Sequence, residues 1–302
     1  MRPVEVSNIS KSFGTTRAVV DVSFAVERGE IFGLLGPNGA GKTTAIRLML
    51  DIFRPDRGTV SILGGPMTEA KKDRIGYMPE ERGLYQDMPL EQCLVYLATL
   101  KGLSKAEARR RLGTYLERFD LAQNRRKKVK ELSRGMQQKA QIVNTVLHGP
   151  ELLIVDEPFS GLDPVNTQLV KGLIRDLREG GRTIVMSTHM MHQVEELCDR
   201  ILLIDHGRAV LYGGLDQIRR DHSGHAVLVR VPGDLPQMAG VEAVIQRNGA
   251  LQLTLSAGTD PQDILQQLLR NHATVERFEI AVPTLDEIFI RTVGKAQVDR
   301  GA

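Results

Sequence analysis

The stretch that decides the fold is Gly36-Pro37-Asn38-Gly39-Ala40-Gly41-Lys42-Thr43-Thr44. It fits the pattern G-x-x-x-x-G-K-[ST] of a phosphate-binding loop, which connects a buried strand to a helix. The apolar run of residues 30–35 before it predicts the strand. The helix-forming residues 44–50 after it predict the helix. The alternative, a glycine-rich turn with an isolated lysine, does not account for both flanking elements.

The chemistry of this loop points to nucleotide phosphates. Glycines allow backbone N–H groups to turn inward around a phosphate chain, and the N-terminus of the following helix adds partial positive charge. Lys42 can reach the terminal phosphates, and the hydroxyl of Thr43 can ligate Mg²⁺. We therefore expect every residue from Gly36 to Thr44 to bind nucleotide, with Lys42 also catalytic and Thr43 also a metal ligand.

Two acids follow a second apolar run. Residues 152–155 are continuously apolar, as expected of a parallel strand buried on both faces. Loops at the carboxyl ends of such strands form ligand crevices. We expect Asp156 to hold Mg²⁺ through water and Glu157 to act as the general base that polarises the attacking water. The alternative is a pair of solvated acids, but their place after a phosphate loop favours the catalytic interpretation.

His189 follows a third apolar run, residues 183–186, and then Ser187-Thr188. A lone histidine is more often structural than catalytic. The strand end would bring His189 near the γ-phosphate of a nucleotide, where it could donate a hydrogen bond. The sequence leaves its protonation state open.

Ser133 and Gly135 precede a helical stretch over residues 136–147. Taken alone, this is a capped helix with an apolar side. A helix N-terminus also attracts anions, so it could face a phosphate.

Together, these motifs resemble the ATP-binding subunits of ABC transporters over residues 1 to about 220. Residues 36–44 are similar to the Walker A motif of that family and Asp156-Glu157 to Walker B with its catalytic glutamate. Residues 133–137 are similar to the signature motif, residues 160–163 to the D-loop and His189 to the H-loop. The resemblance implies ATP and Mg²⁺ as cofactors.

The resemblance adds further site residues. Phe13 stands where the family places an aromatic that stacks on adenine; the alternative is an ordinary core aromatic. Ser133 and Gly135 correspond to residues that contact ATP, and Asp163 belongs to the D-loop. Arg134 and Met136 depart from the common signature Ser-Gly-Gly-Gln-Gln, so their usual side-chain contacts are in doubt.

Glu80 stands where most members carry the Q-loop glutamine. A carboxylate can ligate Mg²⁺ but cannot donate a hydrogen bond when ionised. The stretch Glu80–Tyr85 resembles bacterial ABC-2-type exporter subunits, including sodium- and drug-export ATPases.

The implied function is an ATPase subunit that drives export across the cytoplasmic membrane, from its cytoplasmic face in a bacterium. In the family, two such subunits sandwich two ATP molecules, so a homodimer or a paired nucleotide-binding subunit is expected, together with separate transmembrane permease chains. One alternative is a soluble ABC ATPase in translation or DNA maintenance, although such proteins usually carry two ATPase units or a long coiled coil. A second is a non-catalytic nucleotide-binding regulator, against which Glu157 argues.

The composition of the chain agrees with the interpretation as an ATPase subunit of a transporter. The net charge of +3 over 302 residues is too small to indicate nucleic-acid binding. No apolar run approaches the length that spans a bilayer, so the membrane path is expected on another chain. Cys93 and Cys198 have neither metal-ligand spacing nor a disulfide framework.

The predicted fold is α/β: a P-loop NTPase of the ABC ATPase type with an antiparallel β layer, a helical insert and a small C-terminal α+β domain. Residues 1–221 are expected to form the nucleotide-binding domain, with strands near 4–10 and 18–26 and the insert at about 88–149.

The accessory domain is expected over residues 224–302 and is similar to the tail of drug-exporter ATPases in this family. Asn248-Gly249 is a hairpin signal. Residues 261–270 show an amphipathic helical pattern, and Thr284 with Glu287 forms a capping box for a helix over 285–293. Its role, packing or regulation, stays open.

Overall fold

The computed structural model describes residues 1–292 except 82, 223–225, 234, 248, 257, 282 and 291, and within that range the side chain of residue 247 is also left out. The chain divides into two compact units, Met1–Gly214 and Leu215–Ala302. The sequence placed the boundary at residues 221–224, part of which lies outside the described residues. The second unit begins earlier because helix α8 (Leu215–His222), which the sequence pattern did not reveal, belongs to it.

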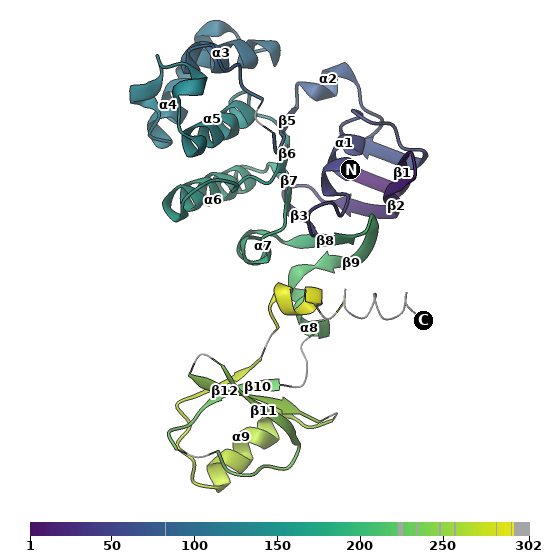
Figure 1. The fold of residues 1–302 in the computed structure, drawn as a ribbon, viewed down its shortest axis with the longest axis vertical. Helices are drawn as coiled ribbons and strands as arrows, with labels where there is room; N and C mark the ends of the chain where they lie inside the picture. The colour runs from purple at the N-terminus through teal and green to yellow at the C-terminus, as the bar shows by residue number, and fades with distance from the viewer. Residues whose placement is uncertain are drawn as a thin grey trace. The chain divides into compact units, whose positions relative to one another are not determined.

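The centre of the first unit is a six-stranded sheet with the order β5-β6-β7-β3-β8-β9 (Figure 1). Its strands are β5 (Ile75–Met78), β6 (Leu152–Asp156), β7 (Thr183–Thr188), β3 (Ile31–Leu35), β8 (Arg200–Asp205) and β9 (Arg208–Gly214). All pairs are parallel except β8 with β9. Every residue of β3, β6 and β7 is buried, as continuous apolar runs require.

A second, antiparallel sheet has the order β2-β1-β4. It contains β1 (Val4–Phe13), β2 (Thr16–Val26) and β4 (Arg57–Ile62). Helix α1 (Lys42–Met49) lies between the two sheets, where its buried residues join one hydrophobic core with strands of both (Figure 1). The predicted antiparallel layer is confirmed, although β4 was not expected from the sequence.

The opposite face of the central sheet is covered by α5 (Arg134–Val146) and α6 (Pro164–Glu179) (Figure 1). Helix α5 belongs to the predicted helical insert. The insert also contains α3 (Leu90–Leu100), α4 (Lys105–Arg118) and two short 3-10 turns, η1 (Ala122–Asn124) and η2 (Val129–Glu131). Two short helices, α2 (Glu69–Lys72) and α7 (Met191–Leu197), complete this unit. Cys93 in α3 and Cys198 after α7 are both buried free thiols.

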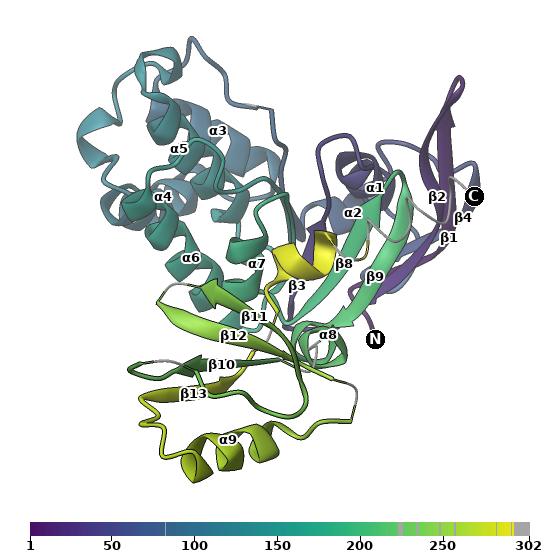
Figure 2. The ribbon, with the colours of Figure 1, turned by 60° about the horizontal axis from the view of Figure 1, so that its bottom comes forward.

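The second unit carries a four-stranded antiparallel sheet with the order β11-β12-β10-β13 (Figure 2). Its strands are β10 (Ala226–Arg230), β11 (Val241–Arg247), β12 (Ala250–Leu255) and β13 (Arg277–Ile280), and α9 (Pro261–Arg270) packs on one face. Strands β11 and β12 pair as the predicted hairpin, although Asn248 of its turn lies outside the described residues.

The capping box is also present, because Thr284 N donates to Glu287 and Glu287 N donates to the Thr284 hydroxyl. Residues 285–290 are helical, and the rest of the predicted last helix falls largely outside the described residues. The predicted fold class is confirmed. Among the residues that the structure describes, no helix combines the length and the apolar character needed to cross a lipid bilayer.

Candidate functional site

The phosphate-binding loop connects β3 to α1 and passes very close to two other strands. Gly36 has φ +148°, and a Cβ there would lie 2.1 Å from the carbonyl oxygen of Ile204 in β8. Gly41 has φ +110°, and a Cβ there would lie 2.3 Å from the carbonyl oxygen of Ala18 in β2. Both positions therefore require glycine, for conformation and for space. The loop is fixed between the two sheets.

Lys42 is the first residue of α1 and its side chain turns back over the loop. Its Nζ donates to the carbonyl oxygens of Gly36 at 2.8 Å and Pro37 at 3.2 Å. The side chain is buried, and burial lowers the pKa of Lys42 against the opposing effect of three carboxylates, chiefly Glu157. The ammonium group thus lies at the loop mouth, where a terminal phosphate would satisfy its charge.

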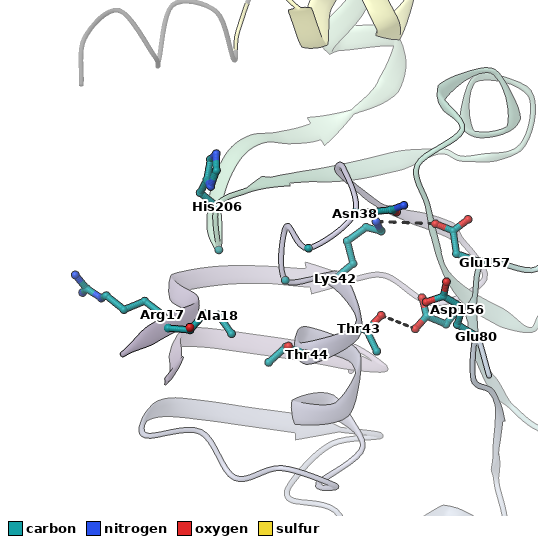
Figure 3. A pocket seen from close by; sticks show the side chains of 14 residues that line it. Arg17, Ala18, Asn38, Lys42, Thr43, Thr44, Glu80, Asp156, Glu157 and His206 are labelled. Carbon is teal, nitrogen blue, oxygen red and sulfur yellow. Dashed lines mark hydrogen bonds and ion pairs between the residues drawn. The ribbon is translucent and has the colours of Figure 1, made fainter. Parts of the chain in front are cut away.

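Thr43 and Asp156 lie side by side. The Thr43 hydroxyl donates to Oδ2 of Asp156 at 2.8 Å (Figure 3). The Ser187 hydroxyl donates to Oδ1 of the same carboxylate. Asp156 ends β6 and is 1 % exposed. Strand order brings this carboxylate to the loop, because β3 and β6 both neighbour β7 and all three end at the same edge.

Glu157 follows directly and has φ +51°, a left-handed conformation that is uncommon outside glycine. Its buried carboxylate accepts hydrogen bonds from the Thr188 hydroxyl at 3.1 Å and from His189 N at 3.0 Å. It lies 3.9 Å from the ammonium group of Lys42. Strained conformations of this kind persist where the surrounding structure fixes them, often at functional sites.

His189 contacts Glu157, with Nδ1 at 2.8 Å from Oε1 of the carboxylate. A carboxylate oxygen accepts, so Nδ1 carries the hydrogen. His189 is not among the residues that line the cavity beside the loop, which is described next. The structure places the imidazole against Glu157, and the contact with the γ-phosphate that the sequence predicted stays a prediction.

A cavity of about 530 Å³ extends from the loop (Figure 3). Predicted residues that line it are Asn38, Gly39, Gly41, Lys42, Thr43, Thr44, Glu80, Asp156 and Glu157. Sequence reasoning missed Thr16, Arg17 and Ala18 at the start of β2 and His206 and Gly207 in the turn between β8 and β9. The sequence gives little indication that these two segments bind a ligand, since neither contains a recognisable motif. The close approach of Gly41 to Ala18 explains why β2 belongs to the site.

The other predicted site residues are not part of the cavity lining. Gly36, Pro37 and Ala40 belong to the loop but not to the cavity lining, and Ala40 N donates to Pro37 O at 3.1 Å. Phe13 is 44 % exposed and packs edge-on against Phe53, with ring centroids 5.3 Å apart.

Ser133, Gly135 and Asp163 lie at two helix starts outside the cavity lining. The Ser133 hydroxyl caps α5 by accepting from Met136 N at 3.3 Å, and Asp163 caps α6 by accepting from Asn166 N at 2.9 Å. The hydrogen bond from Asn166 N lowers the pKa of Asp163. A Cβ on Gly135 would lie 3.6 Å from Gly161 O, so the two helix starts are neighbours.

The oxygen donors at the mouth of the cavity suit Mg²⁺. Thr43 and Asp156 are in contact, and Glu80 lines the same cavity. The described residues hold no group of three or more histidine, cysteine, aspartate or glutamate side chains that could cage a metal. Mg²⁺ usually needs only one or two protein carboxylates when it binds with phosphates and water. The donor set therefore fits a nucleotide-bound Mg²⁺.

Comparisons with known proteins cover most of the chain. The ABC transporter family profile matches residues 19–160, and the profile described as "ATP-binding protein DrrA1-3-like, C-terminal domain" matches residues 213–293. The chain is 41 % identical over 293 residues to an uncharacterized ABC transporter ATP-binding protein, YhaQ, from Bacillus subtilis, covering 96 % of this chain and 98 % of that protein.

It is also 32 % identical to the Nod factor export ATP-binding protein I of a Rhizobium species, covering 97 % of each chain. Among solved structures, an ATP-binding subunit of an ABC transporter aligns with a TM-score of 0.68 and 36 % identity, over 72 % of this chain and 92 % of that one.

Proposed function

The chain belongs to the family of ABC transporter ATP-binding subunits, in the branch of ABC-2-type exporter subunits, and we propose a specific division of labour among its residues. Proteins of this family hydrolyse ATP and couple hydrolysis to transport by separate membrane chains. The first unit carries the phosphate loop and the acids, and the DrrA-like second unit is proposed to be an accessory domain.

Glu157 is the proposed general base, and the geometry around it is the observation that carries the proposal. Its buried carboxylate is held by three hydrogen bonds and faces Lys42 across 3.9 Å. A base held in this way can polarise a water that attacks the terminal phosphate. His189 orients Glu157 through Nδ1. Lys42 binds the β- and γ-phosphates in place of the two loop carbonyls that it now contacts.

Mg²⁺ is the proposed metal cofactor, and when bound it neutralises charge on the phosphate oxygens. Thr43, Asp156 and Glu80 are the proposed oxygen ligands, supported by the contact between the first two and by the place of Glu80 in the cavity lining. Arg17 and the start of β2 lie at the far end of the cavity from Lys42 (Figure 3), so the adenosine part is proposed to lie there. Phe13 at the end of β1 pairs with Thr16 of β2 and is proposed to stack on the adenine.

The proposed active assembly contains two copies, or this chain and a paired subunit. Ser133 is exposed at the start of the 13-residue helix α5, whose first turn holds no acid. This helix start, with Gly135, is proposed to contact ATP bound to the other copy, because such ends favour anions. Asp163 at the neighbouring start of α6 is proposed to lie at the same interface.

The proposed membrane partner is a separate permease that moves its substrate outward, from the cytoplasmic face of a bacterial membrane. The Nod factor relative is named for export, which supports this direction. A groove of about 330 Å³ beside Tyr77 offers a docking surface three residues from Glu80, with Leu50, Ile52, Met67 and Lys101 among its lining. The small net charge of +3 supports a partner other than nucleic acid.

The test is to purify the tagged chain from host membranes in detergent and identify what copurifies. We expect a polytopic membrane protein in near-stoichiometric amount, and reconstitution with it should raise the ATPase rate. Recovery only with ribosomes or DNA would overturn the proposed transport function while leaving the ATPase assignment in place.

A further inference from the structure

Gln141 on α5 contacts the segment that carries Glu80. Its side-chain amide donates to the carbonyl oxygen of Pro79 at 2.7 Å and to that of Glu81 at 3.2 Å. These are the two carbonyls on either side of Glu80. Gln141 is 3 % exposed, so water does not compete for the two bonds. One buried amide therefore fixes the backbone from which the Glu80 side chain reaches the cavity.

Gln138 makes a similar contact one turn earlier on the same helix. Its amide donates to the carbonyl oxygen of Pro158 at 3.2 Å and lies 3.5 Å from that of Glu157. Residues three apart lie on the same face of a helix. Helix α5 thus presents two amides on one face, one to the segment after Glu157 and one to the segment around Glu80.

Only the donor end of the Gln141 side-chain amide is hydrogen-bonded. Its Oε1 is buried and has no hydrogen-bond partner among the described residues. An unpaired buried polar atom destabilises the folded state, which offsets part of what the two donated bonds contribute. The benefit must come from the two donated bonds.

We propose that Gln141 is a positioning residue for Glu80. We also propose that α5 links the exposed helix start at Ser133–Gly135 to two segments of the ATP site, the one around Glu80 and the one after Glu157. The inference rests on the proposed roles of Glu80 and Glu157. A helix of this length moves as a rigid body, so displacement of its first turn by a second subunit shifts Gln138 and Gln141 together. The Glu80 and Glu157 segments would follow because each is bonded to the helix.

The experiment compares Gln141→Met with Thr145→Val. Methionine keeps the length of the side chain and removes both donors. Thr145 is a matched control, since it is buried on the same helix one turn later and its hydroxyl donates to Gln141 O, at 2.9 Å. Measurements are the melting temperature, kcat and KM for ATP, and the Mg²⁺ dependence of nucleotide binding.

For Gln141→Met we expect a kcat about tenfold lower, measured well below the melting transition, since misplacing a reacting group by roughly 1 Å can cost up to about 100-fold. The melting temperature should fall modestly, because the carbonyls of Pro79 and Glu81 lose their donor. The Mg²⁺ concentration for half-maximal nucleotide binding should rise, as we also expect for Glu80→Ala, which removes the proposed ligand. Thr145→Val should change none of these. Equal losses of kcat in the two variants, or a Mg²⁺ dependence of nucleotide binding that stays at the wild-type value in Gln141→Met, would overturn the positioning role.

The double variant Gln141→Met with Glu80→Ala tests this inference separately from the proposed function on which it rests. If Gln141 acts through Glu80, adding Gln141→Met to Glu80→Ala should lower kcat no further. Fully multiplicative losses would overturn the inference alone. Retention of ATPase activity in Glu157→Gln would instead overturn the proposed function.

Discussion

The ammonium nitrogen of Lys42 lies 3.9 Å from Oε1 of Glu157, and both side chains are buried. At this distance the two groups form an ion pair but no direct hydrogen bond. Each group makes its hydrogen bonds to other partners. Lys42 bonds to loop carbonyls, and Glu157 is held from the side of Thr188 and His189. The roles proposed for the two residues can therefore be tested one at a time.

Glu157→Gln should leave ATP affinity within about twofold and lower kcat by about 100- to 10,000-fold, the usual contribution of a general base. The amide keeps the shape of the side chain but cannot accept a proton from water. Steady-state ATPase assays and equilibrium nucleotide binding measure the two quantities. Glu151→Gln is the control, since this half-exposed carboxylate precedes the same strand and pairs with Arg74. A near wild-type rate in Glu157→Gln would refute the assignment of the base.

Lys42→Ala should weaken ATP binding by about 10- to 100-fold, as expected when one hydrogen bond to a charged group is lost. Isothermal titration with ATP and Mg²⁺ gives the affinity. Lys71→Ala is a matched control, because Lys71 Nζ also donates to two backbone carbonyls, those of Ile62 and Pro66, without lining the cavity. Equal affinities in the two variants would mean that the loop from Gly36 to Thr44 is not the phosphate site.

Glu80→Ala should lower the ATPase stimulation given by the membrane chains more than the basal rate. The loop loses its contact with the ATP site, while Glu157 stays in place. Glu80→Gln should still bind nucleotide, because the local shape is kept. Glu81→Ala, a neighbouring exposed acid outside the cavity lining, is the control. The coupling role is wrong if Glu80→Ala preserves both rates.

His148, after α5, should make the first unit less stable in mild acid. Burial, reinforced by the charge of Lys101, lowers the pKa of His148 to about 4. Its Nε2 bonds to Ile75 O at 3.2 Å, and its buried Nδ1 has no partner among the described residues. Between pH 6.5 and 4 the unfolded chain binds a proton here that the folded chain does not. The contribution to stability is therefore complete above pH 6.5 and falls by up to about 3 kcal/mol as the pH drops to 4.

The measurement is urea unfolding of wild type and His148→Gln at pH 7 and pH 5. Glutamine can keep the donor to Ile75 O and does not titrate. The wild type should lose more stability than the variant between the two pH values. Parallel losses would show that His148 is not responsible.

Sequence reasoning succeeded where structure depends on neighbours along the chain. The glycines of residues 36–44, the capping residues Ser133 and Thr284 and the apolar runs predicted strands, loops and helices from local conformation and periodicity. The range of α9 was predicted to the residue. The set of elements was predicted less fully, because some segments carry weaker patterns. The missed elements include β4, α2, β5, β9 and α8.

Only the tertiary structure decided which segments meet at the site. The amide of Gln141 reaches Pro79 across 62 residues, and His189 reaches Glu157 across 32. Ala18 approaches Gly41, and the turn at His206 and Gly207 completes the cavity. These contacts follow from strand order in two sheets and from how α5 packs on them, which depends on the whole core. A local pattern specifies what a residue can do chemically, whereas its partner is fixed only when distant strands and helices pack together.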